Sequence, residues 1–189
     1  ATAQHKFDSL QELMEAGLRV PRTFCTRTTL SIDEALAFCG GLPVIMKLIK
    51  GSQGQGVIYI DSLPTLRSML GAILGTGNNV LIQQFIPEAT VSDVRVLILN
   101  GRIVGAVKRV THTGEFRSNF HRGGRPELTE LNPEEASICL KAAAAFGLNL
   151  AGVDFVRTRD GTVVLEVNPN PGFEGFEKAS GIDVASRII

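Results

Sequence analysis

The sequence predicts an α+β fold built on a largely antiparallel sheet. Most apolar runs have the length of strands, several of them pair as hairpins, and helical patterns lie between them. The strongest hairpin signal is Asn100-Gly101, which joins the two apolar runs of residues 93–110. The length of 189 residues suits one domain, or two small lobes that share a core.

Helices are predicted where apolar residues recur every three or four positions and capping residues mark the ends. Ser31 followed by Glu34 has the pattern of a capping box, and Asn132 marks the start of a later helix. Gly17 ends the first helix. In chain order, the predicted helices cover residues 5–17, 31–40, 62–74 and 132–146, with one or two short helices after residue 172.

Short runs of valine, isoleucine and leucine between turn residues predict the strands. The connection from residue 111 to about residue 130 is polar and long for a compact domain, which favours a functional role. In chain order, the predicted strands cover residues 21–26, 43–50, 57–60, 79–86, both halves of 93–110, 150–158 and 162–168.

Charge and cysteine content narrow the class of protein. The chain has 19 basic and 19 acidic residues, so its net charge indicates neither a nucleic-acid-binding protein nor one that binds anionic membranes. No apolar run approaches the roughly 20 residues of a membrane span. Cys25, Cys39 and Cys139 fit no zinc-binding spacing, and we expect free thiols in the cytoplasm. The chain lacks an initial methionine and stops within a helical pattern, which predicts a piece of a longer protein.

The segment VVLEVN places a carboxylate, Glu166, inside an apolar strand pattern, where burial without a partner is costly. A three-residue turn at 159–161 would set Asp154 directly opposite Glu166, with Asn168 on the same face. A two-residue Asp-Gly turn would scatter these polar groups instead. The other face, which is the predicted core, carries Val153, Phe155, Leu165 and Val167.

Two carboxylates that face each other on neighbouring strands repel. A divalent cation would relieve the repulsion, because Asp, Glu and an amide carbonyl are hard oxygen ligands suited to magnesium that bridges nucleotide phosphates. A raised pKa or a nearby arginine would also relieve it. A solvated face with ordinary surface charges is the remaining interpretation.

Three glycines fall within residues 51–56, GSQGQG, between two predicted strands. No Gly-Lys-Ser/Thr follows, and no helix follows, so this is neither a Walker loop nor a dinucleotide fingerprint. A strand–loop–strand with exposed amides can fold over phosphates as a flap, with Lys47 of the preceding strand as a point charge. A flexible hairpin tip with a surface lysine is the alternative.

The hairpin of residues 93–110 carries charges on one predicted face. A turn at Asn100-Gly101 would set Asp93 opposite Lys108, with Arg95 on the same side. Cross-strand ion pairing on a solvated face explains such a set by itself.

Residues 108–125 are basic, with two phenylalanines interleaved. This composition could bind single-stranded RNA, or it could bind phosphates and carboxylates of a ligand through arginines. A zinc site at His112 and His121 is a weaker option, because no third ligand lies at a recognised spacing. A solvated basic loop is the remaining interpretation. The basic side chains are Lys108, Arg109, Arg117, Arg122 and Arg125.

Taken together, these motifs resemble the ATP-grasp carboxylate–amine ligases, and within them the RimK-type α-L-glutamate ligases. The segments that carry the resemblance are KLIKGSQGQGV, DVRVLILNGRIVGAVKR, GEFRSNFHRGG, AGVDFVR and LEVNPNPGFEGFEKASGIDVA, in the order and at the spacings of the family. The resemblance implies an ATP-grasp fold, in which two α+β lobes sandwich ATP. It places a smaller lobe at about 20–86, with the glycine-rich flap, and a larger lobe at 1–19 and 87–189. Family enzymes carry a further amino-terminal domain, which this segment lacks.

The resemblance also implies site residues. Lys47 would contact the phosphates under the flap, Gln84 and Phe85 would hold the adenine edge by backbone groups, and Asp93 would bind the ribose. Asp154, Glu166 and Asn168 match the ligands of Mg²⁺ or Mn²⁺, with two ions per site and Glu166 as the bridge. The family positions near the triphosphate are Arg117, Ser118 and Asn119, of which Arg117 would be catalytic.

The implied activity is an ATP- and magnesium-dependent ligase that forms an amide or peptide bond through an acylphosphate. The expected partners are ATP, glutamate or a similar amino acid, and an acceptor carboxylate on a protein or peptide, for which a ribosomal protein is one candidate. No membrane partner is expected, and a homo-oligomer is compatible with the sequence. The alternatives are an RNA- or ribosome-binding module that uses residues 108–125, and an ATP-binding fragment without activity.

Overall fold

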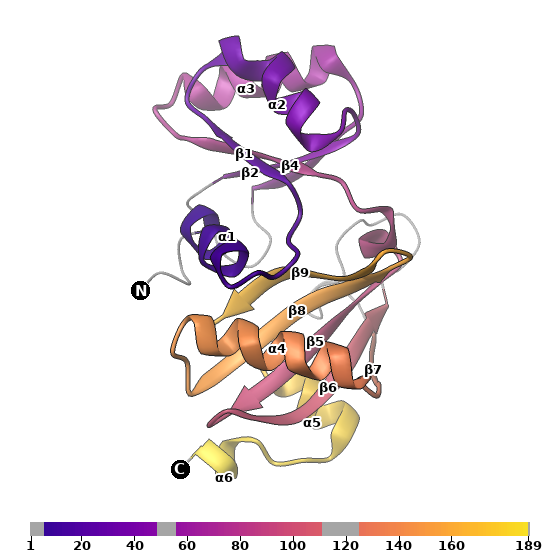
Figure 1. Ribbon diagram of the computed structural model, residues 1–189. Coiled ribbons are helices and arrows are strands. Elements are labelled where there is room, and N and C mark those ends of the chain that lie inside the picture. The colour runs from indigo at the N-terminus through magenta and orange to yellow at the C-terminus, as the bar shows by residue number, and fades with distance from the viewer. Residues whose placement is uncertain (1–5, 49–55, 111–124, 189) are drawn as a thin grey trace. The chain divides into compact units, whose positions relative to one another are not determined.

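The computed structural model describes residues 6–48, 56–110 and 125–188. The chain divides into two compact units, and each has its own sheet (Figure 1). Unit 1 combines Ala1–Val20 with Pro87–Ile189, and unit 2 is Pro21–Ile86.

Unit 2 is a four-stranded antiparallel sheet in the order β1-β4-β2-β3, with its helices packed on one face. A single apolar cluster joins the helices to the sheet; Ile32, Cys39 and Leu70 from the helices meet Met46 and Ile82 from the strands. The strands are β1 (Thr23–Thr26), β2 (Val44–Leu48), β3 (Val57–Ile60) and β4 (Val80–Gln84). The helices are η2 (Thr29–Ser31), α2 (Ile32–Cys39) and α3 (Leu63–Leu74).

Unit 1 is a five-stranded antiparallel sheet in the order β7-β6-β5-β8-β9. The strands are β5 (Ser92–Leu99), β6 (Arg102–Val110), β7 (Arg125–Leu128), β8 (Leu150–Thr158) and β9 (Gly161–Asn168). The helices are α1 (Lys6–Glu15), η3 (Pro87–Thr90), α4 (Pro133–Ala145), α5 (Glu174–Ser180) and α6 (Ala185–Ile188).

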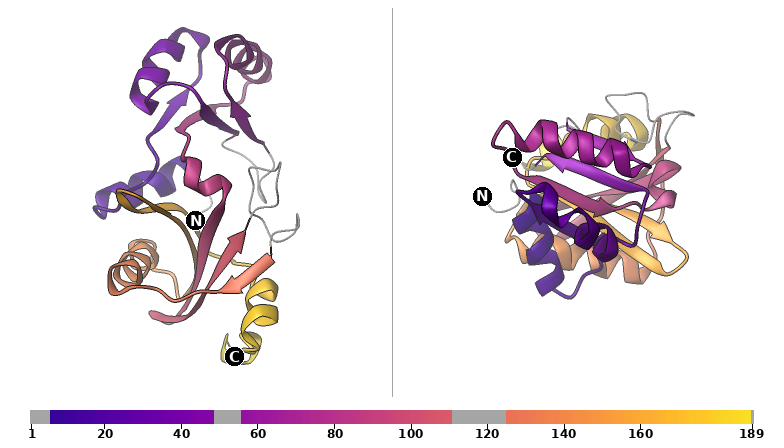
Figure 2. Two further views of the ribbon diagram at one scale, coloured as in Figure 1. Left: turned by 90° about the vertical axis from the view of Figure 1, so that its right-hand side faces the viewer. Right: turned by 90° about the horizontal axis from the view of Figure 1, so that it is seen from above.

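The two faces of this sheet are covered differently. Helix α4 lies on one face, where Cys139 and Ala142 join Val96 and Phe155 in the main core. Helix α5 lies on the other face, where its Phe176 packs in a smaller cluster (Figure 2, left). The smaller cluster covers only part of this face of the sheet. Polar side chains occupy the rest of the face, and they form the candidate site.

The predicted α+β class and antiparallel sheets are confirmed. The capping box at Asn132 is present, with Glu135 as its partner, and it begins α4. The capping box predicted at Ser31 is wrong, because Ser31 makes no side-chain cap bond. A one-turn helix, η2, precedes α2 there, and Thr28 caps it.

The hairpin of β5 and β6 has the predicted turn but a different register. Asn100 and Gly101 both have positive φ, as a tight two-residue turn requires. A β-bulge then shifts the pairing between Leu97 and Ile98. As a result Asp93 lies opposite Arg109, and the prediction that it lies opposite Lys108 is wrong.

The hairpin of β8 and β9 also contains a β-bulge. Thr158 pairs with Gly161, so the turn has two residues and the predicted three-residue turn is wrong. The bulge then restores the predicted pairing of Asp154 with Glu166. Because the shift changes which side chains face inward, Val164 lies in the core at the place predicted for Leu165.

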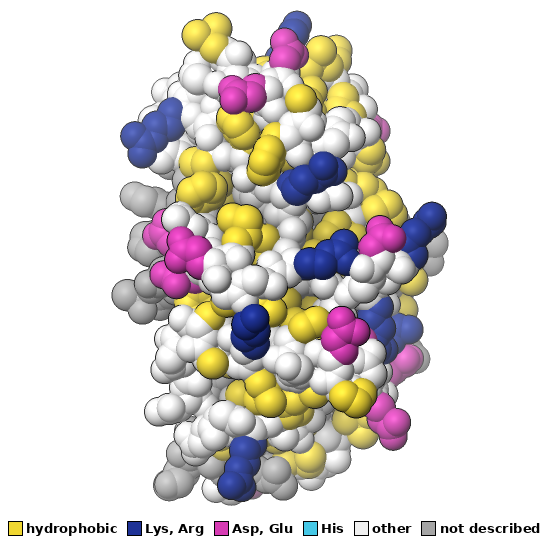
Figure 3. Space-filling model, viewed as in Figure 1, with side chains coloured by type: hydrophobic (Ala, Val, Ile, Leu, Met, Phe, Trp, Pro, Cys, Tyr) yellow, Lys and Arg dark blue, Asp and Glu magenta, His cyan; other side chains and the backbone are white. Residues whose placement is uncertain are grey.

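Surface charge is mixed on the face shown in Figure 3, where basic and acidic side chains are interspersed. Among the described residues, no helix combines the length and the apolar character that a membrane crossing needs. The three cysteines are free, as predicted.

Candidate functional site

Asp154 of β8 lies at the centre of a buried ionic cluster in unit 1. Arg95 on the adjacent strand β5 donates from Nε to Oδ1 at 2.7 Å and from Nη2 to Oδ2 at 2.6 Å. The two residues are opposite each other in the antiparallel pairing, so their side chains share a face. The bidentate arrangement makes this a strong, charge-assisted pair.

Arg109 of β6 joins this pair to a second carboxylate. Its Nη2 donates to Oδ2 of Asp154 at 2.9 Å, and its Nε donates to Oδ1 of Asp93 at 2.7 Å. A further bond runs from Nη2 to Oδ2 of Asp93. The side chains of Arg109 and Asp93 are only 5% and 8% exposed. One guanidinium therefore bridges two buried carboxylates.

The charges in this cluster keep one another ionised. Burial alone would raise the pKa of Asp154, but the charges of Arg109 and Arg95 outweigh burial and lower it. Burial alone would lower the pKa of Arg109, but the charges of Asp154 and Asp93 outweigh burial and raise it. Two carboxylates and two guanidiniums thus balance in formal charge at neutral pH.

Glu166 of β9 lies opposite Asp154 but has an exposed side chain. Burial lowers the pKa of Lys6 on α1, and the charge of Glu166 opposes that lowering, so Lys6 lies within electrostatic reach. Asn168 lies opposite Gly152, and its Nδ2 is buried without a hydrogen-bond partner among the described residues. On β9, a carboxylate therefore lies opposite Asp154, and an amide lies two residues further along the strand.

The three predicted metal ligands fit magnesium in donor type. Two carboxylates and an amide oxygen are hard oxygen donors. Nδ2 of Asn168 is buried and has no hydrogen-bond partner among the described residues. A half turn about the terminal torsion of this side chain would put the amide oxygen in the place of the nitrogen. In the described part of the chain, no three side chains from His, Cys, Asp and Glu form a metal cluster. The assignment of Asn168 as a third oxygen ligand stays a prediction.

The predicted nucleotide residues of unit 2 lie on its strands or directly after them. Lys47 is on the inner strand β2, where it pairs with Val57 of β3. The backbone N–H of Gln84 donates to the carbonyl of Arg22 at 2.8 Å, so this N–H is not available to an adenine edge. The ring of Phe85 meets Tyr59 edge to face at a centroid distance of 5.1 Å.

Three predicted residues lie outside the described residues: Arg117, Ser118 and Asn119. The same holds for residues 51–55 of the glycine loop and for residues 111–124 of the basic segment, His112, His121 and Arg122 included. Their roles stay predictions.

Sequence reasoning did not connect Arg95 and Arg109 to Asp154. A nearby arginine was one of the possible remedies for the facing carboxylates, but no residue was assigned to it. The pairing of β5 with β8 brings Arg95 to Asp154, and the bulge in β5–β6 brings Arg109 to Asp93. The strand order has no local signal. Gly105 inside the strand of residues 102–110 is a signal typical of a bulge, and the alternation of charged and apolar residues on β5 indicates a polar face.

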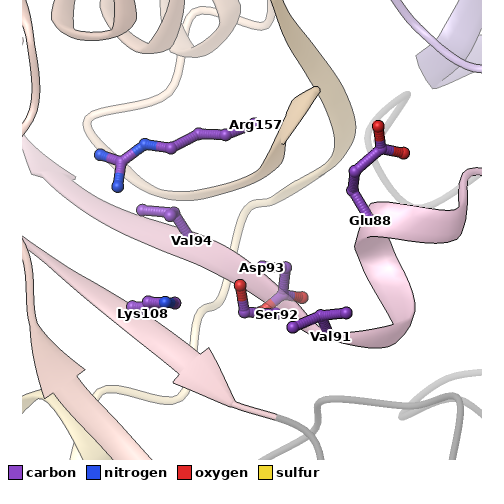
Figure 4. Close-up of a pocket in the computed structure, with 7 residues that line it drawn as sticks. All are labelled: Glu88, Val91, Ser92, Asp93, Val94, Lys108 and Arg157. Atoms are coloured by element: carbon purple, nitrogen blue, oxygen red, sulfur yellow. The ribbon is translucent and has the colours of Figure 1, made fainter. Parts of the chain in front are cut away.

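A cavity of about 340 Å³ opens beside η3 in unit 1 (Figure 4), and Asp93 of the ionic cluster is one of its lining residues. Lys108 lies opposite Val94 on the strand pairing, which puts its side chain on the side away from Arg95. Arg157 reaches this cavity while its Nε and Nη2 donate to Glu135 at 2.6 and 2.9 Å. The cavity is lined by Glu88, Val91, Ser92, Asp93, Val94, Lys108 and Arg157.

Comparison with known proteins decides the family. Residues 3–189 match the family described as the RimK-like ATP-grasp domain. The chain belongs to this family. The predicted resemblance and the predicted ATP-grasp fold are both confirmed.

A relative of this RimK-like ATP-grasp domain matches almost the whole chain. The chain is 44% identical to "Probable alpha-L-glutamate ligase 2" of Pseudoalteromonas atlantica over 187 residues, which cover 99% of this chain and 62% of the relative. This chain thus spans less than two thirds of that relative.

Among solved structures, the RimK domain ATP-grasp protein of Sphaerobacter thermophilus is 25% identical with a TM-score of 0.77, covering 99% of this chain and 66% of that one. The ATP-grasp ligase PsnB, complexed with a minimal precursor, Mg and ADP, is 26% identical with a TM-score of 0.76, covering 97% of this chain and 56% of PsnB.

Proposed function

We propose that this chain is the nucleotide- and metal-binding part of an ATP-dependent carboxylate–amine ligase. The observation that carries the proposal is the pairing of Asp154 with Glu166, with Asn168 two residues further on the same strand, in a RimK-like ATP-grasp domain. These three donors suit Mg²⁺ or Mn²⁺. When bound, two ions would neutralise phosphate charge and favour in-line transfer of the γ-phosphoryl group.

Each predicted residue has a role in this proposal. Asp154, Glu166 and Asn168 would hold the ions and supply them with hard oxygen donors. Asp93 binds the ribose; each of its carboxylate oxygens can accept a second hydrogen bond, so a ribose hydroxyl adds to the bonds from Arg109. The remaining nucleotide contacts are assigned to Lys47 and residues 51–56 at the phosphates, the backbone carbonyl of Gln84 and the backbone of Phe85 at the adenine, and Arg117, Ser118 and Asn119 near the triphosphate.

The reaction has two steps. An oxygen of the acceptor carboxylate attacks the γ-phosphorus, and the bond from that phosphorus to the β–γ bridging oxygen breaks, which gives an acylphosphate and ADP. The amine nitrogen then attacks the acyl carbon, inorganic phosphate leaves with the bonding electron pair, and the nitrogen loses a proton to solvent. In this proposal Arg117 stabilises the negative charge that develops on the transferring phosphoryl group.

Glutamate is the proposed amine donor, because the curated relatives are named alpha-L-glutamate ligases. A protein or peptide is the proposed acceptor, because PsnB was solved with a precursor peptide. We expect the enzyme in the cytoplasm, consistent with free thiols at all three cysteines.

Phosphate release tests the proposal. The complete enzyme is incubated with Mg-ATP, glutamate and candidate acceptor peptides, and we expect release of phosphate and ADP that depends on both substrates. Mass spectrometry of the acceptor should show the mass of one or more added glutamyl residues. If the chain binds Mg-ATP but no donor and acceptor pair releases ADP, the ligase proposal fails in favour of an ATP-binding fragment without activity.

A further inference from the structure

Arg95 and a metal ion would compete for the same carboxylate. Arg95 donates to both oxygens of Asp154, at 2.7 Å to Oδ1 and 2.6 Å to Oδ2. Arg109 adds a third bond, to Oδ2 at 2.9 Å. Three of the roughly four acceptor positions of the carboxylate are therefore taken by guanidinium N–H groups. Mg²⁺ requires its oxygens at about 2.0–2.1 Å in near-ideal octahedral geometry, so it cannot share Oδ1 with Arg95 without strong charge repulsion.

The two arginines are not equally free to leave. Arg109 is 5% exposed and is also held by two bonds to Asp93. Arg95 is 22% exposed, and within the described residues its guanidinium bonds to Asp154 alone. Arg95 is already partly exposed, so its release brings its charge into solvent, whereas release of Arg109 would remove one guanidinium from two buried carboxylates at once.

We propose that Arg95 occupies the carboxylate of Asp154 in the absence of metal, and that a metal ion bound to a nucleotide displaces it. Arg109 stays in position and keeps Asp154 ionised and oriented. The displaced guanidinium then needs an anion, and the phosphates that accompany the metal are anions that arginine binds in a bidentate manner. Free metal therefore binds weakly, and the metal–nucleotide complex binds well. This inference rests on the metal site of the proposed function.

The affinity for free Mn²⁺ tests the inference, by calorimetry and by the electron paramagnetic resonance signal of unbound Mn²⁺. In the full 189-residue chain, Arg95→Gln removes the competing cation, and we expect it to bind free Mn²⁺ about tenfold more tightly than the unsubstituted chain, the size of effect that loss of one charge-assisted pair produces. The same variant should gain no affinity for Mn-ADP. Arg102→Gln is the matched control, because Arg102 is an exposed residue of the same hairpin, and its affinities should not change.

A second variant, Arg95→Lys, tests the inference even if Arg95→Gln does not fold. Arg95→Lys keeps the charge but loses the bidentate fork, so we expect an intermediate gain in affinity for free Mn²⁺. If either folded variant binds free Mn²⁺ as weakly as the unsubstituted chain, or more weakly, the inference is overturned while the metal site stands. If the unsubstituted chain binds neither Mn²⁺ nor Mn-ADP, the proposed metal site fails, and the inference fails with it.

Discussion

Nη2 of Arg109 lies 2.9 Å from Oδ2 of Asp154, and the same guanidinium is bonded to Asp93. One buried cation on β6 thus connects the carboxylate proposed for the ribose with a carboxylate proposed for the metal. Arg109 therefore both stabilises the fold and positions Asp154. Substitutions of Arg109 and of the residues around it should differ in their effects on stability and on binding.

Arg109→Met should destabilise unit 1 strongly. The substitution leaves two buried carboxylates short of positive charge, and removal of one partner from a buried pair costs about 3–5 kcal/mol. Urea denaturation followed by circular dichroism measures the loss. Arg102→Met, on the exposed part of the same strand, should change stability by less than about 0.5 kcal/mol. Equal stability of the two variants would contradict the buried bridge.

Asp154→Asn and Glu166→Gln should both abolish binding of Mg-ATP, because each removes an ionised oxygen donor. Their stabilities should differ. Loss of the charge at Asp154, which is buried between two arginines, should cost about 3 kcal/mol, whereas loss of the charge at the exposed Glu166 should cost at most about 1 kcal/mol. Calorimetry with Mg-ATP and thermal melting of each variant make the measurement. Unchanged affinity in both variants, together with unchanged turnover in the complete enzyme, would refute the metal assignment.

Stability should fall in acid because of Asp154. The arginines outweigh burial and hold its folded-state pKa below the unfolded value of about 4. A depressed pKa means that folding favours the ionised form, so this contribution is complete above pH 4 and is lost as the pH falls through the folded-state pKa. Urea midpoints between pH 7 and pH 3 should fall more steeply for the unsubstituted chain than for Asp154→Asn. Parallel curves would show that Asp154 does not govern the acid response.

Gly152→Ala should disturb the segment after Asn168. A Cβ at residue 152 would lie 2.7 Å from Cβ of Pro171, which is closer than real contacts allow. Relief of this clash must move Pro171 or β8, at a cost of about 1–3 kcal/mol. Gly172→Ala is the control, since a Cβ there meets nothing within 4 Å. The melting temperature of Gly152→Ala should be lower than that of Gly172→Ala. Equal melting temperatures would mean that Pro171 or β8 moves without loss of stability.

Local patterns in the sequence determined much of this protein. Alternation of apolar residues predicted the strands, Asn100-Gly101 predicted a turn that the structure contains, and the motifs predicted the family before any comparison. The pairing of Asp154 with Glu166 was also predictable, although the turn that produces it was not. These features depend on residues close together in the chain, where backbone geometry and side-chain period leave few choices.

The tertiary structure decided which charges meet. Two bulges shift the register by one residue, and each shift moves side chains to the opposite face. One bulge lies beside Gly105, where Phe176 packs so closely that a Cβ would lie 2.7 Å from its ring. A contact between residues so far apart in the chain has no local signature. The bulge between β5 and β6 is why Arg109 rather than Lys108 faces Asp93. Asp154 rather than Glu166 is the buried carboxylate because β8 lies between β5 and β9, whereas β9 is the edge strand.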